Sequence, residues 1–171
     1  MRYTIFAAIL ALTLSANSAN ATGGSPKPGF ITTGNPSAPH FITTDVPSIP
    51  RFKGMEHFLE KFPQATDVNC KTKGQFTEVN FVWNGLRLQA FYNAAGDPVA
   101  TSRFISVENL PVPALMNLKK DYSSYVVTEA VEFDGIEDGL CYYITVRGPK
   151  NTYLLHVSTS GTISVFKKMK Q

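Results

Sequence analysis

Residues 76–93 read FTEVNFVWNGLRLQAFYN, and this stretch predicts a β-hairpin. The Asn84-Gly85 pair favours a two-residue turn, and strand-forming side chains flank it on both sides. In the second strand, the even-numbered side chains from Leu86 to Tyr92 are apolar, whereas the odd-numbered ones from Arg87 to Asn93 are mixed or polar. Because successive side chains of a strand point to opposite faces, we expect one face of this hairpin to pack on a core.

A short helix and further strands are expected around this hairpin, and the same order of one helix and four strands recurs once later in the chain. Met55, Phe58, Leu59 and Phe62 form the i, i+3, i+4, i+7 stripe of a short helix. A second short helix is marked by apolar residues at 115, 118 and 122, which lie 60 positions after those at 55, 58 and 62. Four strands are expected after each helix, at residues 65–72, 76–83, 86–93, 99–106, 125–133, 140–147, 152–158 and 162–167.

The expected fold class is therefore α+β, with two helix-plus-four-strand repeats that form an antiparallel sheet with both helices on one face. The second repeat alternates as the first does. Its even-numbered side chains from Leu140 to Val146 share one face, and its odd-numbered ones from Cys141 to Thr145 share the other. We expect the more apolar set to lie under the helices, which leaves the other face open.

The N-terminal part differs from the rest of the chain. Residues 1–21 have a positive start, an uncharged run and the small-residue end Ala19-Asn20-Ala21, which together predict a secretory signal peptide cleaved after Ala21. The expected location of the mature chain is the periplasm or the exterior of the cell. Residues 51–171 are then the folded domain.

Residues 22–50 form a proline-rich linker or arm that contains six of the 11 prolines. Its sequence GFITTGNPSAP at 29–39 is echoed by HFITTDVPSIP at 40–50, an 11-residue duplication. Two interpretations stay open. The copies are either a mobile spacer or two short strand segments that add to a sheet edge.

The net charge, the apolar runs and the two cysteines limit the possible classes of function and structure. The net charge of +3 is too small for the basic surface expected of a nucleic-acid-binding protein, and no apolar run after the signal reaches the roughly 18 residues of a membrane span. Cys70 and Cys141 are the two cysteines, and an even count in an oxidising compartment makes them a candidate disulfide. The alternative is two separate small apolar residues.

No constellation for catalysis is recognisable. The three histidines, His40, His57 and His156, are scattered and form no ligand pair. No phosphate-binding glycine loop or nucleophile motif occurs either, so no catalytic residue, metal site or cofactor is expected. The acidic residues at 129, 132, 134, 137 and 138 lack the spacing of a calcium loop and are interpreted as a solvated hairpin.

Several of these features together resemble one family. A helix that ends in Phe62-Pro63, the Asn84-Gly85 turn, Phe91 followed by Gly96-Asp97, Leu110-Pro111, and a second copy that closes on Gly161 are similar to the PepSY-like family of exported bacterial proteins. That family is akin to the tandem-repeat β-lactamase inhibitor proteins, and the resemblance covers roughly residues 54–166. It implies a non-catalytic protein that binds a partner on the open sheet face. The short Asn84-Gly85 turn departs from the related inhibitors, which insert an acidic hairpin loop into the partner.

The main functional hypothesis is an exported binding protein, an inhibitor or sensor of an envelope enzyme such as a peptidase. Its partner would be an envelope or extracellular protein that the sequence does not identify. The candidate contact residues on the open face are Arg87, Phe91, Tyr143, Thr145 and His156. The alternative hypothesis is a periplasmic protein that binds a small ligand or a metal through His156 and the acidic hairpin. The oligomeric state stays open.

Overall fold

The computed structural model of the protein describes residues 50–170. The expected signal peptide at 1–21, and residues 22–49 with nearly all of the duplicated arm, lie outside the described residues. Within the described part, no helix is long and apolar enough to cross a membrane.

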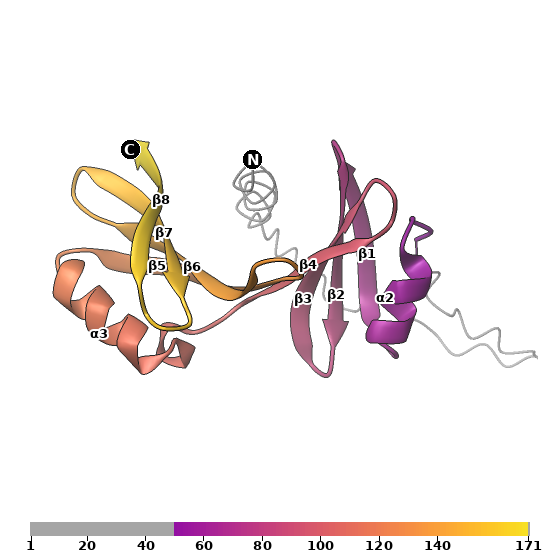
Figure 1. The fold of residues 1–171 in the computed structure, drawn as a ribbon, viewed down its shortest axis with the longest axis horizontal. Helices are drawn as coiled ribbons and strands as arrows, with labels where there is room; N and C mark the ends of the chain where they lie inside the picture. Colours follow the sequence, from indigo (N-terminus) through magenta and orange to yellow (C-terminus); the bar gives the residue numbers. More distant parts are fainter. Residues whose placement is uncertain (1–49, 171) are drawn as a thin grey trace, which may run out of the picture. The chain divides into compact units, whose positions relative to one another are not determined.

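Eight antiparallel strands form one sheet, and their order across the sheet is their order along the chain (Figure 1). The turn between the second and third strands has positive φ at both Asn84 (50°) and Gly85 (76°), as a two-residue type I′ hairpin turn requires. The strands are β1 (Thr66–Lys73), β2 (Phe76–Trp83), β3 (Leu86–Asn93), β4 (Pro98–Phe104), β5 (Val126–Gly135), β6 (Gly139–Arg147), β7 (Asn151–Ser158) and β8 (Ile163–Lys170).

The expected α+β class, with two helix-plus-four-strand repeats, is wrong. Residues 50–170 form mostly this one sheet, and the two α-helices among them are short. Helix α2 (Met55–Lys61) has 7 residues, and helix α3 (Val112–Asp121) has 10. The fold is therefore close to all-β. The β4–β5 ladder joins the two sets of four strands into a continuous sheet, and α2 is too short to bury its whole predicted stripe, since Leu59 is 41% exposed.

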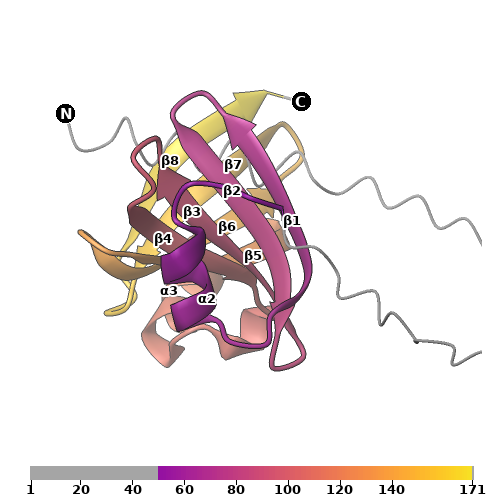
Figure 2. The same cartoon turned by 90° about the vertical axis from the view of Figure 1, so that its right-hand side faces the viewer.

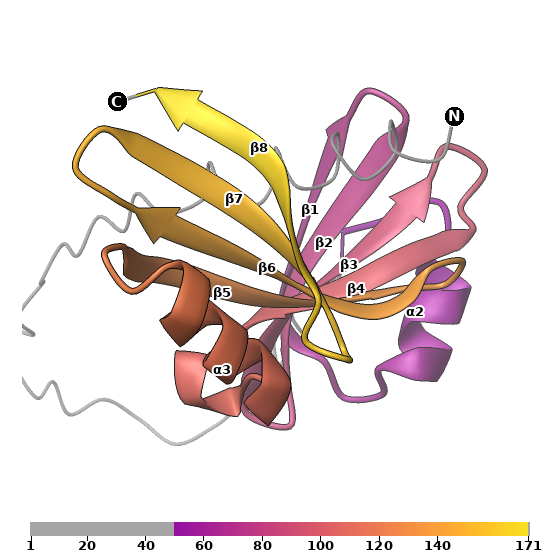
Figure 3. The same ribbon diagram turned by 60° about the vertical axis from the view of Figure 1, so that its left-hand side comes forward.

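Strand register places both helices on the same face of the sheet. Ala90 on β3 lies in the core under α2 and pairs with Thr101 on β4, which in turn pairs with Asp134 on β5. Two positions along β5, Glu132 pairs with Tyr142, which lies in the core under α3. Cross-strand partners share a face, so the two cores lie on one side of the sheet. Figure 3 shows α2 and α3 on this side.

The two cores differ in composition. Under α2, the buried side chains are mostly aromatic, and Figure 2 looks onto this helix and the strands beneath it. Under α3, they are mostly aliphatic. The buried residues of the α2 core are Phe58, Phe62, Val79, Phe81, Ala90 and Tyr92, and those of the α3 core are Leu110, Ala114, Leu118, Tyr142, Ile144, Val146, Leu155 and Val157.

Candidate binding surface

The face of the sheet opposite α2 and α3 is called the open face below. Arg87 and Phe91 alternate with the core residues of β3, and Tyr143 and Thr145 alternate with those of β6. His156 on β7 is the cross-strand partner of Tyr143. All five predicted contact residues therefore lie on the open face, over which neither α2 nor α3 packs.

Three of these five residues lie together. Tyr143 and His156 have ring centroids 5.4 Å apart, and Thr145 occupies the next position of β6 on the same face. Arg87 lies apart from them, near the β2–β3 turn, where its cross-strand partner is Val82. The open face therefore carries one compact group and one separate cation from the predicted set.

Exposure separates the predicted contact residues into two kinds. Phe91 is 0% exposed, and Tyr143 and Thr145 are also buried, whereas Arg87 is exposed and His156 is half-buried. Only the last two therefore offer much surface to a partner in this structure. The buried three contribute to the shape and rigidity of the face.

Four rings form a row across the open face, called the aromatic row. Phe91 and Phe133 lie 6.4 Å apart between ring centroids, Phe133 and Tyr143 lie 5.9 Å apart, and Tyr143 and Phe166 lie 5.3 Å apart. The last two contacts are edge-on, which is the favoured geometry for aromatic pairs. The row connects β3, β5, β6 and β8, so it links the predicted Phe91 to the group around Tyr143.

Three aromatic residues of the open face were not among the contact residues predicted from the sequence. Alternation along the strand predicted at 125–133 could have found Phe133, and the same count in the strand at 99–106 could have found Phe104, which is 44% exposed. Phe166 is the extra residue of a bulge, since Leu154 pairs with Lys167 and Leu155 pairs with Val165. A bulge changes which side chains share a face, and a strict period of two cannot place it.

A polar network lies beside the aromatic row on β2, β3 and β4. Ser102 Oγ donates to Gln89 Oε1 (3.1 Å), and Gln89 Nε2 donates to Asn80 Oδ1 (2.9 Å) and to Glu78 Oε1 (3.3 Å). Asn80 Nδ2 also donates to Glu78 Oε1 (2.8 Å). These hydrogen bonds lead from Ser102 to Glu78, which is 2% exposed. Its Oε2 is buried and has no hydrogen-bond partner among residues 50–170. A buried acceptor in this state is costly, and it is satisfied when a donor reaches it.

Burial also shifts the titration of groups on the open face. It lowers the pKa of the His156 imidazole, an effect that the Asp138 carboxylate opposes. Burial also raises the pKa of the Glu129 carboxyl group. The Thr145 hydroxyl donates a hydrogen bond to Glu129 Oε2 (3.4 Å), and this bond partly offsets the rise. Both shifts favour the neutral form of the side chain.

The candidate disulfide between Cys70 and Cys141 is not formed, and both residues are free thiols. Cys70 lies on β1 and packs against the α2 core, whereas Cys141 lies on β6 and pairs with open-face residues. Because they occupy opposite faces and are separated by four intervening strands, their side chains do not approach each other. Burial raises the pKa of the Cys141 thiol to about 11, so this thiol stays protonated and unreactive at neutral pH.

The acidic cluster of the sequence is divided between the two faces. Glu132 lies on the helix side and accepts a hydrogen bond from Arg103 Nε (2.7 Å), whereas Glu129 lies on the open face. Among residues 50–170, no group of three or more His, Cys, Asp or Glu side chains could hold a metal ion. The residues named for a metal site, His156 and the hairpin acids, thus form no cage in the described structure.

No protein-family model matches the chain, and no curated protein matches it. Among solved structures, a BLIP-like protein from Bacteroides fragilis NCTC 9343 is similar, with a TM-score of 0.63 and 21% identity, over 74% of this chain and 92% of that chain. A protein from Bacteroides eggerthii DSM 20697 described as periplasmic has a TM-score of 0.61 and 15% identity, over 71% and 88%. A DUF2874 family protein from Bacteroides ovatus ATCC 8483 has a TM-score of 0.63 and 19% identity, over 71% and 87%. At these identities, the likeness shows a shared BLIP-like fold.

Proposed function

We propose that this protein is an exported, non-catalytic binding protein that covers a site on a partner protein with its open face. The fold shared with the BLIP-like protein supports this proposal, and so does the fold shared with the protein described as periplasmic. The predicted signal peptide is consistent with export to the periplasm or beyond. The finer assignment to the PepSY-like family, made on sequence features, belongs to the same proposal.

The observation that carries the proposal is the composition of the open face. Its centre is rigid and buried, because the aromatic row and the polar network pack there. Exposed Arg87 and Phe104, which are of the kinds that interfaces favour, lie around this centre. Val126, which is 67% exposed, adds apolar surface to the same face. A preformed surface of this kind binds with little loss of conformational entropy.

The proposed mechanism is occlusion. The sheet would cover the active site of an envelope enzyme, such as a peptidase, and no bond would be made or broken by this protein. The exposed Phe104 and Val126 would pack against apolar groups of the partner.

The test uses the chain from Thr22 onward as bait in an envelope extract of the source organism. The open-face variant combines Arg87→Glu with Phe104→Glu, because exposed residues can be changed without disturbing the core. The matched control is Met116→Glu on α3, at a position that is 67% exposed on the other side of the sheet. The wild type and the control should retain the same protein, and the open-face variant should lose it.

Two results would contradict the proposal. The first is equal retention of that protein by the open-face variant, with both variants folded as judged by circular dichroism. The second is a captured enzyme whose activity does not fall when the wild-type protein is added in excess. A bait of residues 51–171 separates this proposal from binding by the duplicated arm, since the open face should suffice.

A further inference from the structure

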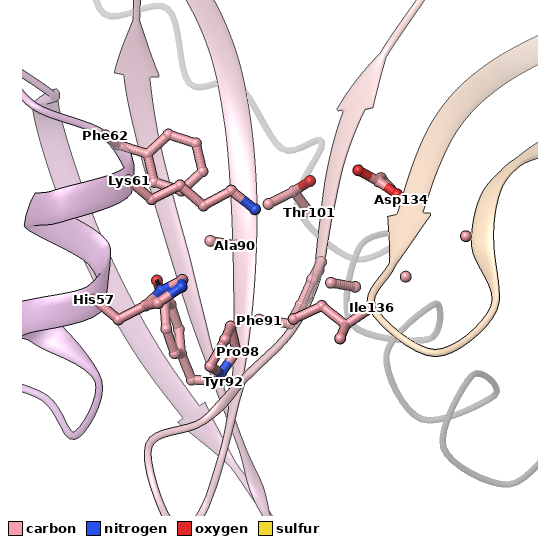
Figure 4. A pocket seen from close by; sticks show the side chains of 13 residues that line it. His57, Lys61, Phe62, Ala90, Phe91, Tyr92, Pro98, Thr101, Asp134 and Ile136 are labelled. Carbon is pink, nitrogen blue, oxygen red and sulfur yellow. Dashed lines mark hydrogen bonds between the residues drawn. The ribbon is translucent and has the colours of Figure 1, made fainter.

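A pocket of about 350 Å³ lies on the helix side of the sheet, away from the open face (Figure 4). Its floor is formed by β3 and β4, one wall by α2, and the other wall by the hairpin between β5 and β6. This volume lies within the range of small-ligand sites. The pocket is therefore a separate candidate site, independent of the proposed function.

The pocket exists because α2 covers β1 to β3 and leaves β4 uncovered. The hairpin wall is attached to β4 by the backbone hydrogen bond from Ile136 N–H to Val99 O (3.0 Å). The helix wall is attached at Gly54, whose backbone meets Gly96 of the β3–β4 turn so closely that a Cβ at Gly54 would lie 2.5 Å from Gly96 O. Both walls are thus fixed to the same two strands, and the width of the pocket is set by the fold.

The two walls carry opposite charges. Lys61 on α2 extends its ammonium group over the floor toward Thr101, and Asp134 stands on the hairpin side (Figure 4). Thr101 and Asp134 are cross-strand partners, so their side chains are neighbours on this face. Among residues 50–170, neither Lys61 nor Asp134 forms an ion pair with another side chain, and the Lys61 ammonium lies 5.6 Å from the centroid of the Phe62 ring. Each charge is free to bind a ligand group of opposite sign.

Further polar and apolar groups complete the lining. His57 lies one turn before Lys61 on α2, and its Nδ1 is hydrogen-bonded to the hydroxyl of Tyr92 (3.3 Å). Burial raises the pKa of Tyr92 to about 12, so this hydroxyl keeps its proton and the ring of His57 is held in place. Phe62 on the helix wall and Ile136 on the hairpin wall add apolar surface, and Ile136 is 60% exposed.

We propose that this pocket binds a short peptide with free termini. The peptide carboxylate would contact Lys61 and His57, and its ammonium group would contact Asp134. A single amino acid would fill only part of a pocket of about 350 Å³, and a peptide of two or three residues suits this volume better. An apolar peptide side chain would pack between Phe62 and Ile136.

The test is a titration of the chain from Thr22 onward with the dipeptide leucyl-leucine, followed by amide and methyl NMR shifts. Two capped probes accompany it: N-acetyl-leucyl-leucine, which lacks the ammonium group, and leucyl-leucine amide, which lacks the carboxylate. We expect the dipeptide to shift the resonances of Thr101 and Ile136, and each capped probe to bind about tenfold more weakly.

Charge-removing variants make the test specific. Lys61→Gln should weaken dipeptide binding and abolish its preference over the amide, and Asp134→Asn should abolish its preference over the N-acetyl form. Asp138→Asn, on the same hairpin but outside the pocket, is the matched control and should bind as the wild type does. The proposal is overturned if the dipeptide leaves the pocket resonances unchanged, if the capped probes bind as well as the dipeptide, or if the control variant loses binding equally.

Discussion

The two ends of the sheet place most of their buried rings on different faces. In the first four strands, most of the buried rings lie under α2, and the open face carries the polar network. In the last four strands, the core under α3 is mostly aliphatic, and these strands carry three of the four rings of the aromatic row on the open face. The rings under α2 are Phe58, Phe62, Phe81 and Tyr92, and those of the second end on the open face are Phe133, Tyr143 and Phe166. Phe91 on the open face and Tyr142 under α3 are the buried exceptions.

Helix length explains part of this difference. Helix α2 has only 7 residues, and the chain around it buries two large rings, Phe58 and Phe62. Helix α3 has 10 residues and buries the smaller Ala114 and Leu118, with Leu110 packed beside them. A short helix can thus close a core with few side chains if they are large. The open face has a polar end, with the hydrogen-bond network, and an aromatic end.

Among the variants that test this difference between the two ends, Phe58→Ala should change the free energy of unfolding most. Phe58 is fully buried, with its ring 4.9 Å from that of Phe81 and 5.5 Å from that of Phe62. Phe58→Ala should lower the free energy of unfolding by about 3–5 kcal/mol. Leu118→Ala, in the aliphatic core, should lower it by about 2–3 kcal/mol, because a smaller and 6% exposed side chain is removed. Urea unfolding followed by circular dichroism measures both.

Neighbouring exposed positions serve as controls for these two variants. Leu59→Ala and Met116→Ala lie on the same helices at 41% and 67% exposure, and each should change the free energy of unfolding by less than about 0.5 kcal/mol. If Leu118→Ala lowered the free energy of unfolding more than Phe58→Ala did, the α2 core would not depend on its few large rings.

A substitution in the polar network of the open face should lower the free energy of unfolding less than the two core substitutions do. Ser102→Ala removes the donor to Gln89 Oε1 and leaves that buried acceptor unpaired, so the free energy of unfolding should fall by about 1 kcal/mol. Ser164→Ala, at an exposed position on the same face, should have no measurable effect. Equal urea midpoints for the two variants would mean that the network adds nothing to stability.

The smallest expected effect is a pH dependence at the aromatic end. Burial lowers the pKa of His156, so the unfolded chain binds a proton more readily than the folded one, and stability should fall as the pH drops below the ordinary histidine value of 6.5. Urea midpoints at about pH 7.5 and about pH 5.5 measure this fall, and His156→Asn should reduce it.

Other groups act on the same measurement. The raised pKa of Glu129 works in the opposite sense, because it stabilises the folded state as the carboxyl group takes up its proton at lower pH. Glu129→Gln is therefore the companion variant, and it should steepen the fall rather than reduce it. An unchanged pH dependence in His156→Asn would rule out this role for His156.

Much of the strand pattern was predictable from sequence, because it depends on local periodicity. The Asn84-Gly85 turn and the alternation from Leu86 to Tyr92 gave the β2–β3 hairpin and its two faces as the structure has them. The fold class was wrong because a stripe of four apolar residues shows where a helix lies but not how little of the fold it forms. Leu59 belonged to that stripe and is nevertheless exposed.

The sites were less predictable, because they depend on packing across the sheet. Alternation placed Phe91 and Tyr143 on the open face but could not show that neighbouring rings bury them. The bulge at Phe166 shifts the period in β8. The pocket on the helix side joins Lys61 to Asp134, two residues far apart in sequence, and no local pattern connects them.

The strictly sequential order of the eight strands has a consequence for how the chain folds. Every ladder joins a strand to the one just before it. Each pairing except β4–β5, whose connection contains α3, therefore closes a short loop and loses little chain entropy. Folding rates fall as the sequence separation between contacting residues grows. We therefore expect this sheet to form faster than a β-sandwich with the same number of strands, because each new hairpin can add to an edge that already exists.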